Sequence, residues 1–268
     1  MQNEKLLKFS QMKNNAKLQQ VGGIGYIFSL PASYSCPFAK LCDSRAVLNK
    51  ETGKYTIEDG KHTEFRCFAA SQEVVYPSVR RQREHNFSLL RECKNDVQKM
   101  KELILLSFPK KLDIIRIHDS GDFFSKNYMQ AFIEVAKIFP DIKFYAYTKS
   151  LNYWVELKDQ IPSNFKLNAS KGGKLDYLIE QHNLKYVEVV YSEQEAKDKG
   201  LEIDHTDKLA YAQEKSFALL IHGVQPKNSK AGEAMKKLKG NSDYNREKIK
   251  KEMKEVTLKK SVTLKKAA

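Results

Sequence analysis

The chain contains no apolar run near the roughly 20 residues that are needed to cross a membrane. Its first residues, MQNEKLLKFSQMKNNAK, lack the long apolar stretch of a secretory signal. Only four cysteines occur in 268 residues. We therefore expect a cytoplasmic protein with no membrane partner. In that reducing compartment its cysteines are more readily metal ligands, catalytic groups or packing residues than disulfides.

Acidic residues are in deficit, because 33 Asp and Glu accompany 47 Lys and Arg, for a net charge of +14. Such an excess predicts an anionic partner, with nucleic acid first. Residues 236–268 alone carry +8 and contain one aromatic residue, Tyr244. We therefore predict a single domain over residues 1–240 and a basic tail over residues 241–268. The tail either contacts phosphate groups of nucleic acid or only makes the chain more soluble.

The sequence does have a regular alternation of strand and helix patterns. Six apolar segments predict strands over residues 25–31, 112–118, 143–147, 165–169, 186–191 and 216–221. Helical periodicity follows over residues 77–108, 128–138, 153–160, 175–182, 193–199 and 230–238. Several strands are apolar on both faces, as strands covered by helices must be. The pattern predicts an α/β fold, a partial (β/α)6 TIM-like barrel of mainly parallel strands, with an open doubly wound sheet as the alternative.

An irregular excursion over residues 32–76 interrupts the alternation after the first strand. It contains Cys36, Cys42 and Cys67, and a hairpin predicted to turn at Asp59-Gly60 could return Cys67 to the other two. Three thiolates suit a [4Fe–4S] cluster with one open iron. They also suit zinc, with His62 or water as the fourth ligand. Three unrelated buried thiols are a further reading.

Cys93 differs from the other three cysteines because it lies within the helix predicted over residues 77–108. A buried thiol in a helix is most simply a packing residue. We therefore expect Cys93 to be structural and to take no part in metal binding.

Polar residues follow most of the predicted strands at their carboxyl ends, where parallel α/β folds form their ligand sites. A shared pocket is thus expected, with Asp122, Thr148, Asn168 and His222 around one cavity that also meets the three cysteine sulfurs. The candidate catalytic residues are Asp122, His118, Lys149 and His222. The candidate cofactor-binding residues are Ser120, Gly121, Asp122, Thr148, Asn168, Ser170 and Gln225.

Several segments resemble the phage and plasmid gene product 88 family of uncharacterised proteins. The resemblance spans roughly residues 20–240 and is carried by SLPASYSCPFA at 29–39, FRCFAASQ at 65–72, RIHDSGDF at 116–123, FYAYTKS at 144–150 and LIHGVQP at 220–226. It implies a phage-type protein but supplies no activity.

A more distant resemblance is to radical S-adenosylmethionine enzymes, which have a partial (β/α)6 barrel and three cysteines after the first strand. By position, Ser120-Gly121-Asp122 corresponds to the segment that contacts the methionine end of the cofactor, and Asn168 and Ser170 to residues that meet the ribose. The usual C-x3-C-x2-C motif is replaced here by C-x5-C and the distant Cys67. The resemblance implies a [4Fe–4S] enzyme that binds S-adenosylmethionine and acts on an unidentified substrate, for which nucleic acid is one candidate. The alternative is a non-catalytic zinc or iron–sulfur protein that binds nucleic acid.

Overall fold

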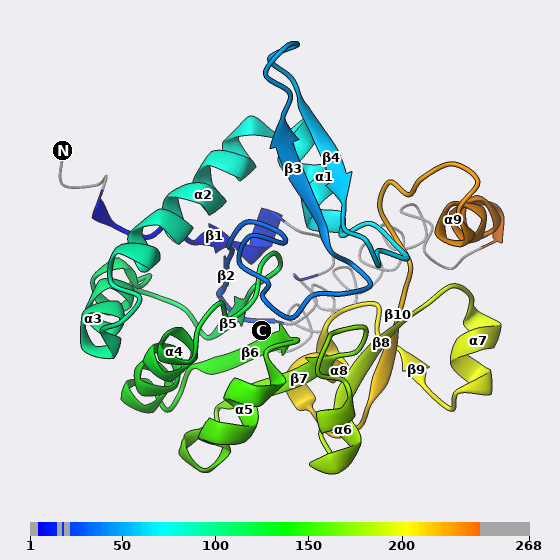
Figure 1. The fold of residues 1–268 in the computed structure, drawn as a ribbon. Coiled ribbons are helices and arrows are strands. Elements are labelled where there is room, and N and C mark those ends of the chain that lie inside the picture. Colours follow the sequence, from blue (N-terminus) through cyan, green and yellow to red (C-terminus); the bar gives the residue numbers. More distant parts are fainter. Residues whose placement is uncertain (1–4, 15–17, 19–21, 242–268) are drawn as a thin grey trace, which may run out of the picture.

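The computed structural model describes residues 5–14, 18 and 22–241, and the predicted tail lies outside these residues apart from Asn241. An eight-stranded sheet runs through the molecule (Figure 1). In spatial order its strands are β1 (Ser10–Gln11), β2 (Gly25–Phe28), β5 (Ile114–Ile117), β6 (Lys143–Thr148), β7 (Phe165–Ser170), β8 (Tyr186–Val190), β10 (Phe217–Leu220) and β9 (Glu202–Ile203).

The six predicted strands correspond to β2, β5, β6, β7, β8 and β10, and all six run parallel to their neighbours in this set. Their order across the sheet is their order along the chain, with no reversal. A doubly wound sheet requires such a reversal, so the sheet is not doubly wound. Within the described residues the sheet stays open, because antiparallel β1 forms one edge and the short β9 forms the other. The mostly parallel α/β fold is confirmed, and the barrel is not closed.

The helices connect these strands, and Figure 1 shows α3 to α7 arranged along the outside of the sheet. The α-helices are α1 (Phe68–Val75), α2 (Pro77–Glu92), α3 (Val97–Ser107), α4 (Lys126–Ile138), α5 (Leu151–Leu157), α6 (Tyr177–Gln181), α7 (Glu193–Asp198), α8 (Lys208–Ala212) and α9 (Lys230–Asn241). Among the described residues, Met12–Asn14 and Lys158–Gln160 form the short 3₁₀ helices η2 and η4. The elements β1, β9, α1 and α8 were not predicted, and β1 and β9 are too short, at two residues each, to show an alternation.

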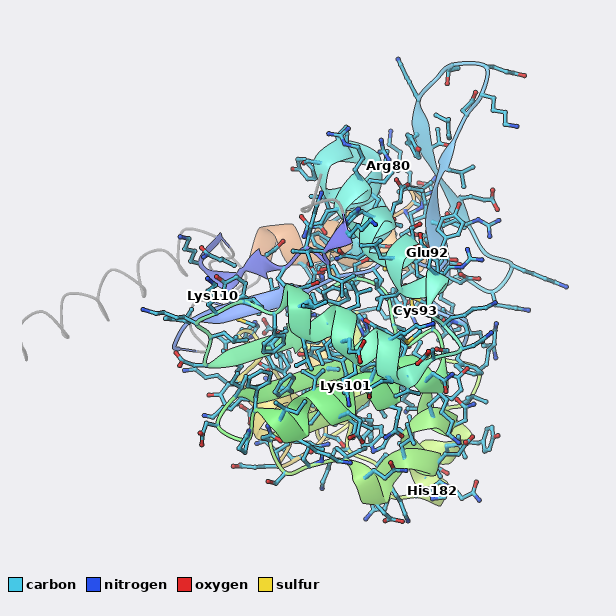
Figure 2. All side chains as sticks on the ribbon, turned by 90° about the vertical axis from the view of Figure 1, so that its left-hand side faces the viewer. Arg80, Glu92, Cys93, Lys101, Lys110 and His182 are labelled. Carbon is cyan, nitrogen blue, oxygen red and sulfur yellow. The ribbon has the colours of Figure 1, made fainter. Side chains whose placement is uncertain are left out.

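The single helix predicted over residues 77–108 is two helices, α2 and α3 (Figure 2). The first ends at Glu92, and Cys93 is its C-terminal cap. Asp96 then begins the second helix, where its carboxylate accepts a hydrogen bond of 3.0 Å from the Lys99 backbone N–H. A side-chain acceptor at this position satisfies a backbone donor that the helix leaves free, which explains the new start.

The hairpin of the excursion also differs from its prediction. Its strands are β3 (Ser44–Leu48) and β4 (Tyr55–Asp59), which pair antiparallel. The turn lies between them and not at Asp59-Gly60, because Asn49 and Lys54 close it with a backbone bond of 2.8 Å. The Asn49 side chain accepts from two further backbone N–H groups inside the turn, as Asn does in tight turns.

Alternation along the strands divides the core into two faces. On β6, Phe144 and Ala146 belong to the larger apolar cluster, together with α4 residues such as Phe132. Tyr145 faces the other way, into a smaller cluster that includes Ala210 of α8. Because both faces of the sheet are covered, the polar residues at the carboxyl ends of its strands form the edge on which a site can be built.

Replacing Phe132 by Ala should lower the free energy of unfolding by about 3–5 kcal/mol, because the ring is fully buried and its removal leaves a cavity. Ile138 on the same helix is 50% exposed, so Ile138→Ala is the matched control and should cost less than about 1 kcal/mol. Urea unfolding of both variants measures the difference. Equal losses would contradict the assignment of this face of α4 to the core.

Candidate functional site

The three cysteines of the excursion are brought together by the return of the hairpin. After β4, the backbone N–H of Gly60 donates to the carbonyl of Asp43 at 2.6 Å, and that of Glu64 donates to the carbonyl of Leu41 at 2.8 Å. These bonds fasten the chain just before Cys67 to the chain around Cys42. A Cβ at Gly60 would lie 2.9 Å from the Asp43 carbonyl oxygen, so this close approach requires glycine.

The three thiols influence one another electrostatically. Burial raises the pKa of Cys36 well above its usual value, and Asp122, Cys67 and Cys42 raise it further. Burial and then Cys42 raise the pKa of Cys67 to about 12. The thiols of Cys36 and Cys67 are therefore protonated at neutral pH unless a cation binds them, since a bound metal deprotonates its thiol ligands.

The predicted metal site remains a prediction. All three cysteines are free thiols. Among the residues that the structure describes, no three His, Cys, Asp or Glu side chains stand in an arrangement that could hold a metal ion. His62, the candidate fourth ligand for zinc, is exposed.

The loop that carries Cys36 and Cys42 is joined to the loop after β7. The Leu41 N–H donates to the Gly172 carbonyl at 3.0 Å, and the Lys174 N–H donates to the Phe38 carbonyl at 2.9 Å. Ala39 and Gly173 form an antiparallel bridge between the same two loops. The glycine pair thus supplies backbone partners to the cysteine loop.

Gly121 is required where the loop after β5 passes the cysteine loop. Its φ of +86° is a conformation that L side chains rarely adopt, and a Cβ there would lie 2.5 Å from Ser35 Oγ and 2.6 Å from Leu30 Cβ. The neighbouring Ser120 also contacts the segment that directly follows β2, because its carbonyl accepts from the Leu30 N–H at 2.9 Å. The two loops therefore pack directly against each other.

Asp122 is the carboxyl group of this site and is only 4% exposed. It accepts hydrogen bonds from Thr148 Oγ1 at 2.6 Å, from the Lys149 N–H at 2.8 Å and from the Phe123 N–H at 2.7 Å. Burial nevertheless raises the pKa of Asp122 to about 6, although these bonds oppose the shift. A buried carboxyl group with such a pKa can hold or release a proton near neutral pH.

Lys149 connects the ends of β6 and β7. Its Nζ donates to Ser170 Oγ at 2.7 Å, to the Ser170 carbonyl at 2.8 Å and to the Lys171 carbonyl at 3.1 Å. These three acceptors match the three protons of an ammonium group. Lys149 is therefore occupied in joining the two strand ends, and a role in binding an anion would require it to leave these partners.

A buried ion pair, which we did not predict from the sequence, contacts the loops that form the site. Glu73 of α1 lies 3.0 Å from Arg83 of α2, and the Arg83 side chain also lies 3.5 Å from Asp119. Glu73 Oε1 further accepts from the Ala32 N–H at 3.0 Å and from Ser120 Oγ at 3.3 Å. Burial raises the pKa of Glu73 even though Arg83 counteracts the shift. In the sequence, the burial of Glu73 could have been inferred from its helical spacing to Ala69 and Ala70, which places the three residues on one face of α1.

His222 and Gln225, after β10, lie against the segment that carries Cys67. Gln225 Oε1 accepts from the Arg66 N–H at 2.8 Å, and its Nε2 donates to the Arg66 carbonyl at 3.1 Å. The His222 ring lies 4.9 Å from the Phe68 ring. These two predicted site residues therefore contact the residues on either side of Cys67 in the sequence.

The other predicted site residues, His118 and Asn168, are placed differently. The His118 ring packs against Phe123 and Tyr128 in the core, and burial lowers its pKa to about 3, so it is neutral. Asn168 lies on the face covered by α8, where its Nδ2 donates to the Ala210 carbonyl at 2.8 Å. Its Oδ1 is buried without a hydrogen-bond partner. The structure thus places Asp122 and Thr148 near the cysteines, whereas the His118 side chain lies in the core.

A comparison with known protein families identifies the family to which the chain belongs. The profile described as gene product 88 matches residues 2–240. The chain belongs to the gene product 88 family. The family resemblance carried by the cysteine, glycine and histidine segments is thereby confirmed.

Two phage relatives of this gene product 88 chain are similar over 111 residues. The gene 88 protein of Mycobacterium phage D29 is 34% identical and that of Mycobacterium phage L5 is 33% identical, each over 39% of this chain and 46% of the relative. The match thus spans about half the length of these curated relatives. No solved structure matches the chain. The resemblance to radical S-adenosylmethionine enzymes gains no support from these comparisons. In the described residues no helix is both long and apolar enough to span a membrane.

Replacing Asp122 by Asn should change how stability depends on pH. The folded pKa of about 6 lies above the unfolded value of about 3.9. The folded state therefore binds this proton more tightly, and the free energy of unfolding falls as the pH rises from about 4 to 6. In the wild type this proton accounts for a fall of up to about 3 kcal/mol in the free energy of unfolding between pH 4 and 7. We expect this part of the fall to be absent in Asp122→Asn.

Urea unfolding of the wild type and of Asp122→Asn at several pH values measures this effect. Asp141 lies on the surface, so Asp141→Asn serves as the matched control. An unchanged pH dependence in Asp122→Asn would show that this carboxyl group does not titrate abnormally.

Proposed function

We propose that this gene product 88 chain is an iron–sulfur enzyme whose [4Fe–4S] cluster is held by Cys36, Cys42 and Cys67. The observation that carries the proposal is the convergence of these thiols with Asp122, because Asp122 and the other two thiols all raise the pKa of Cys36. The four groups come from two distant parts of the excursion and from the end of β5. Packing alone has no need to collect four groups whose ionised forms repel one another.

The three thiols are groups of the kind that holds such a cluster. Iron–sulfur clusters are held by Cys thiolates, and three thiolates leave one iron open for another ligand. Binding would also relieve the burial cost of Cys36 and Cys67, because the metal takes the place of the thiol proton. The cysteine side chains would have to rearrange to bind it, since the described side chains do not form a ligating group.

The more distant resemblance extends this proposal to S-adenosylmethionine. When bound, such a cluster would supply an electron and an open iron to this cofactor. The chain itself offers Ser120-Gly121-Asp122, which packs beside the cysteine loop. Asn168 takes no part in this proposal, because its side chain lies under α8 and donates to the Ala210 carbonyl. Asp122 would hold a proton close to the thiols.

Anaerobic purification with iron, sulfide and zinc analysis tests the cluster. About four irons and a brown colour are expected for the wild type. Replacing Cys36, Cys42 or Cys67 singly by Ala should abolish metal binding. Cys93 caps α2 and its thiol contacts the carbonyls of Leu89 and Leu90, so Cys93→Ala is the matched control and should retain the metal.

Retention of full metal content in any of the first three variants would contradict the proposed ligands. One equivalent of zinc in place of iron would favour the alternative, in which a metal only organises the excursion of a binding protein.

Binding of S-adenosylmethionine is a separate test. Isothermal titration should detect binding to the metal-loaded protein, and no binding to the triple variant Cys36→Ala/Cys42→Ala/Cys67→Ala, because the open iron would provide one anchor. Equal binding by both proteins would show that the cofactor does not depend on the cluster.

A further inference from the structure

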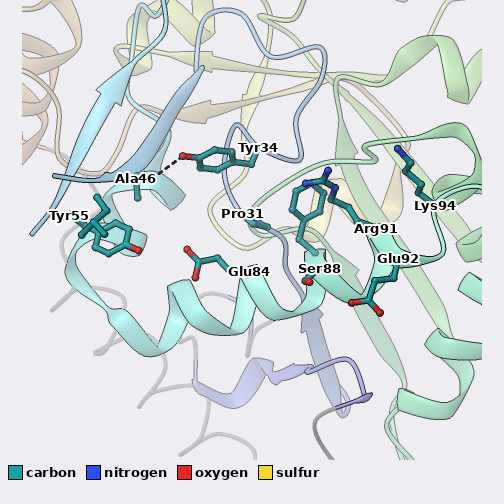
Figure 3. A pocket seen from close by; sticks show the side chains of 11 residues that line it. Pro31, Tyr34, Ala46, Tyr55, Glu84, Ser88, Arg91, Glu92 and Lys94 are labelled. Atoms are coloured by element: carbon teal, nitrogen blue, oxygen red, sulfur yellow. Dashed lines mark hydrogen bonds between the residues drawn. The ribbon is translucent and has the colours of Figure 1, made fainter. Parts of the chain in front are cut away.

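A long groove lies on the outside of the cysteine loop. Two adjoining cavities of about 610 and 660 Å³ share the residues Tyr34, Phe87, Arg91 and Lys94. The first cavity extends to Tyr55 on the hairpin (Figure 3), and the second extends to Tyr153 of α5. The groove therefore runs from the hairpin along α2 and reaches the beginning of α5. Each part is as large as the pockets that hold small organic ligands.

Aromatic rings from four different segments line this groove. Tyr34 belongs to the cysteine loop, Tyr55 to β4, Phe87 to α2 and Tyr153 to α5. The side chain of Tyr34 is 54% exposed although it is large and partly apolar. Its hydroxyl donates to the Ala46 carbonyl at 3.4 Å, which holds the ring at the wall of the groove (Figure 3). The other rings are partly buried, and the Arg80 guanidinium lies 3.4 Å from the centre of the Tyr55 ring. An exposed ring in a concave surface lined by further rings indicates a ligand with flat apolar faces.

Cationic side chains occupy the section that the two cavities share. The Arg91 guanidinium lies 5.5 Å from the centre of the Phe87 ring. In the described residues, no carboxylate forms an ion pair with Arg91 or Lys94. Two carboxylates also line the groove: Glu84 is paired with Arg80 at 4.0 Å, whereas Glu92 forms no ion pair within the described residues. The positive charges in the middle of the groove are thus available to an anionic ligand.

We propose that this groove binds single-stranded nucleic acid. Proteins that bind single strands combine aromatic platforms for the bases with cations that follow the phosphates, and this groove has both. Bases can stack on its rings only when they are not paired within a duplex. The net charge of +14 adds a general attraction for a polyanion.

The groove passes beside the proposed cluster site, because Tyr34 and Pro37 line it on either side of Cys36 in the sequence. Binding of the strand depends only on the rings and cations of the groove. That the strand is also the substrate rests on the proposed function.

Fluorescence anisotropy of the full chain with a labelled oligothymidylate, and with a duplex of the same length, tests the inference. The single strand should bind more tightly than the duplex. Tyr34→Ala should weaken its binding about tenfold, since it removes a ring on which one base can stack. Tyr34→Phe should restore it. Tyr177, which is 64% exposed on α6, gives the matched control Tyr177→Ala with unchanged binding.

The cations are tested through the dependence of affinity on salt. Arg91→Ala/Lys94→Ala should reduce the slope of log K against log salt by about 1.4, since each phosphate contact on a single strand contributes about 0.7. The exposed Lys197 on α7 gives the control Lys197→Ala. The basic tail is present in every variant, so it does not affect these differences.

Three outcomes would overturn the inference: no binding of the oligonucleotide, equal binding of strand and duplex, or wild-type affinity in Tyr34→Ala. Any of them would indicate that the groove binds another class of ligand, such as a peptide. The triple variant Cys36→Ala/Cys42→Ala/Cys67→Ala should still bind the strand. Failure of the proposed cluster is thereby separated from failure of the groove.

Discussion

The buried ion pair between Glu73 and Arg83 is the interaction on which the arrangement of the site depends. It joins α1 to α2, and the same Glu73 oxygen accepts from the loop after β2 and from the loop after β5. A charge in such a position is tolerated only when its hydrogen-bonding capacity is satisfied, because removing one partner leaves the other charge buried and unpaired. Each of these four segments therefore constrains the other three.

This constraint determines where the thiols lie. Cys67 immediately precedes α1, and Cys36 follows the residue that donates to Glu73 by only a few positions. Asp122 is two residues after Ser120, which donates to the same carboxylate. Fixing one carboxylate at the centre of these contacts thus positions the cysteines and Asp122 together. It also positions the groove, because Arg83 and Arg91 belong to the same helix.

The outer and inner sides of the cysteine loop have different chemistry. On the inner side, the half-buried thiols of Cys36 and Cys67 and the buried carboxyl group of Asp122 have raised pKa values. On the outer side, the exposed ring of Tyr34 and the cations Arg91 and Lys94 line the groove. A single short loop, fastened to the glycine segment after β7, therefore separates a site suited to a metal cluster from a surface suited to a polyanion.

The six strands and the helices that follow them could be predicted from the amino-acid sequence, because apolar periodicity and capping are local properties of the chain. The cysteine excursion and the polar strand ends could be located in the same way. The hairpin turn was misplaced, because Asn49 and Gly53 compete locally with Asp59-Gly60. The pairing of Glu73 with Arg83, the burial of His118 in the core and the hydrogen bonds that fasten the end of the hairpin near Cys42 became known only from the three-dimensional structure. These depend on contacts between distant segments, and a side chain's burial and pKa depend on what those segments place around it.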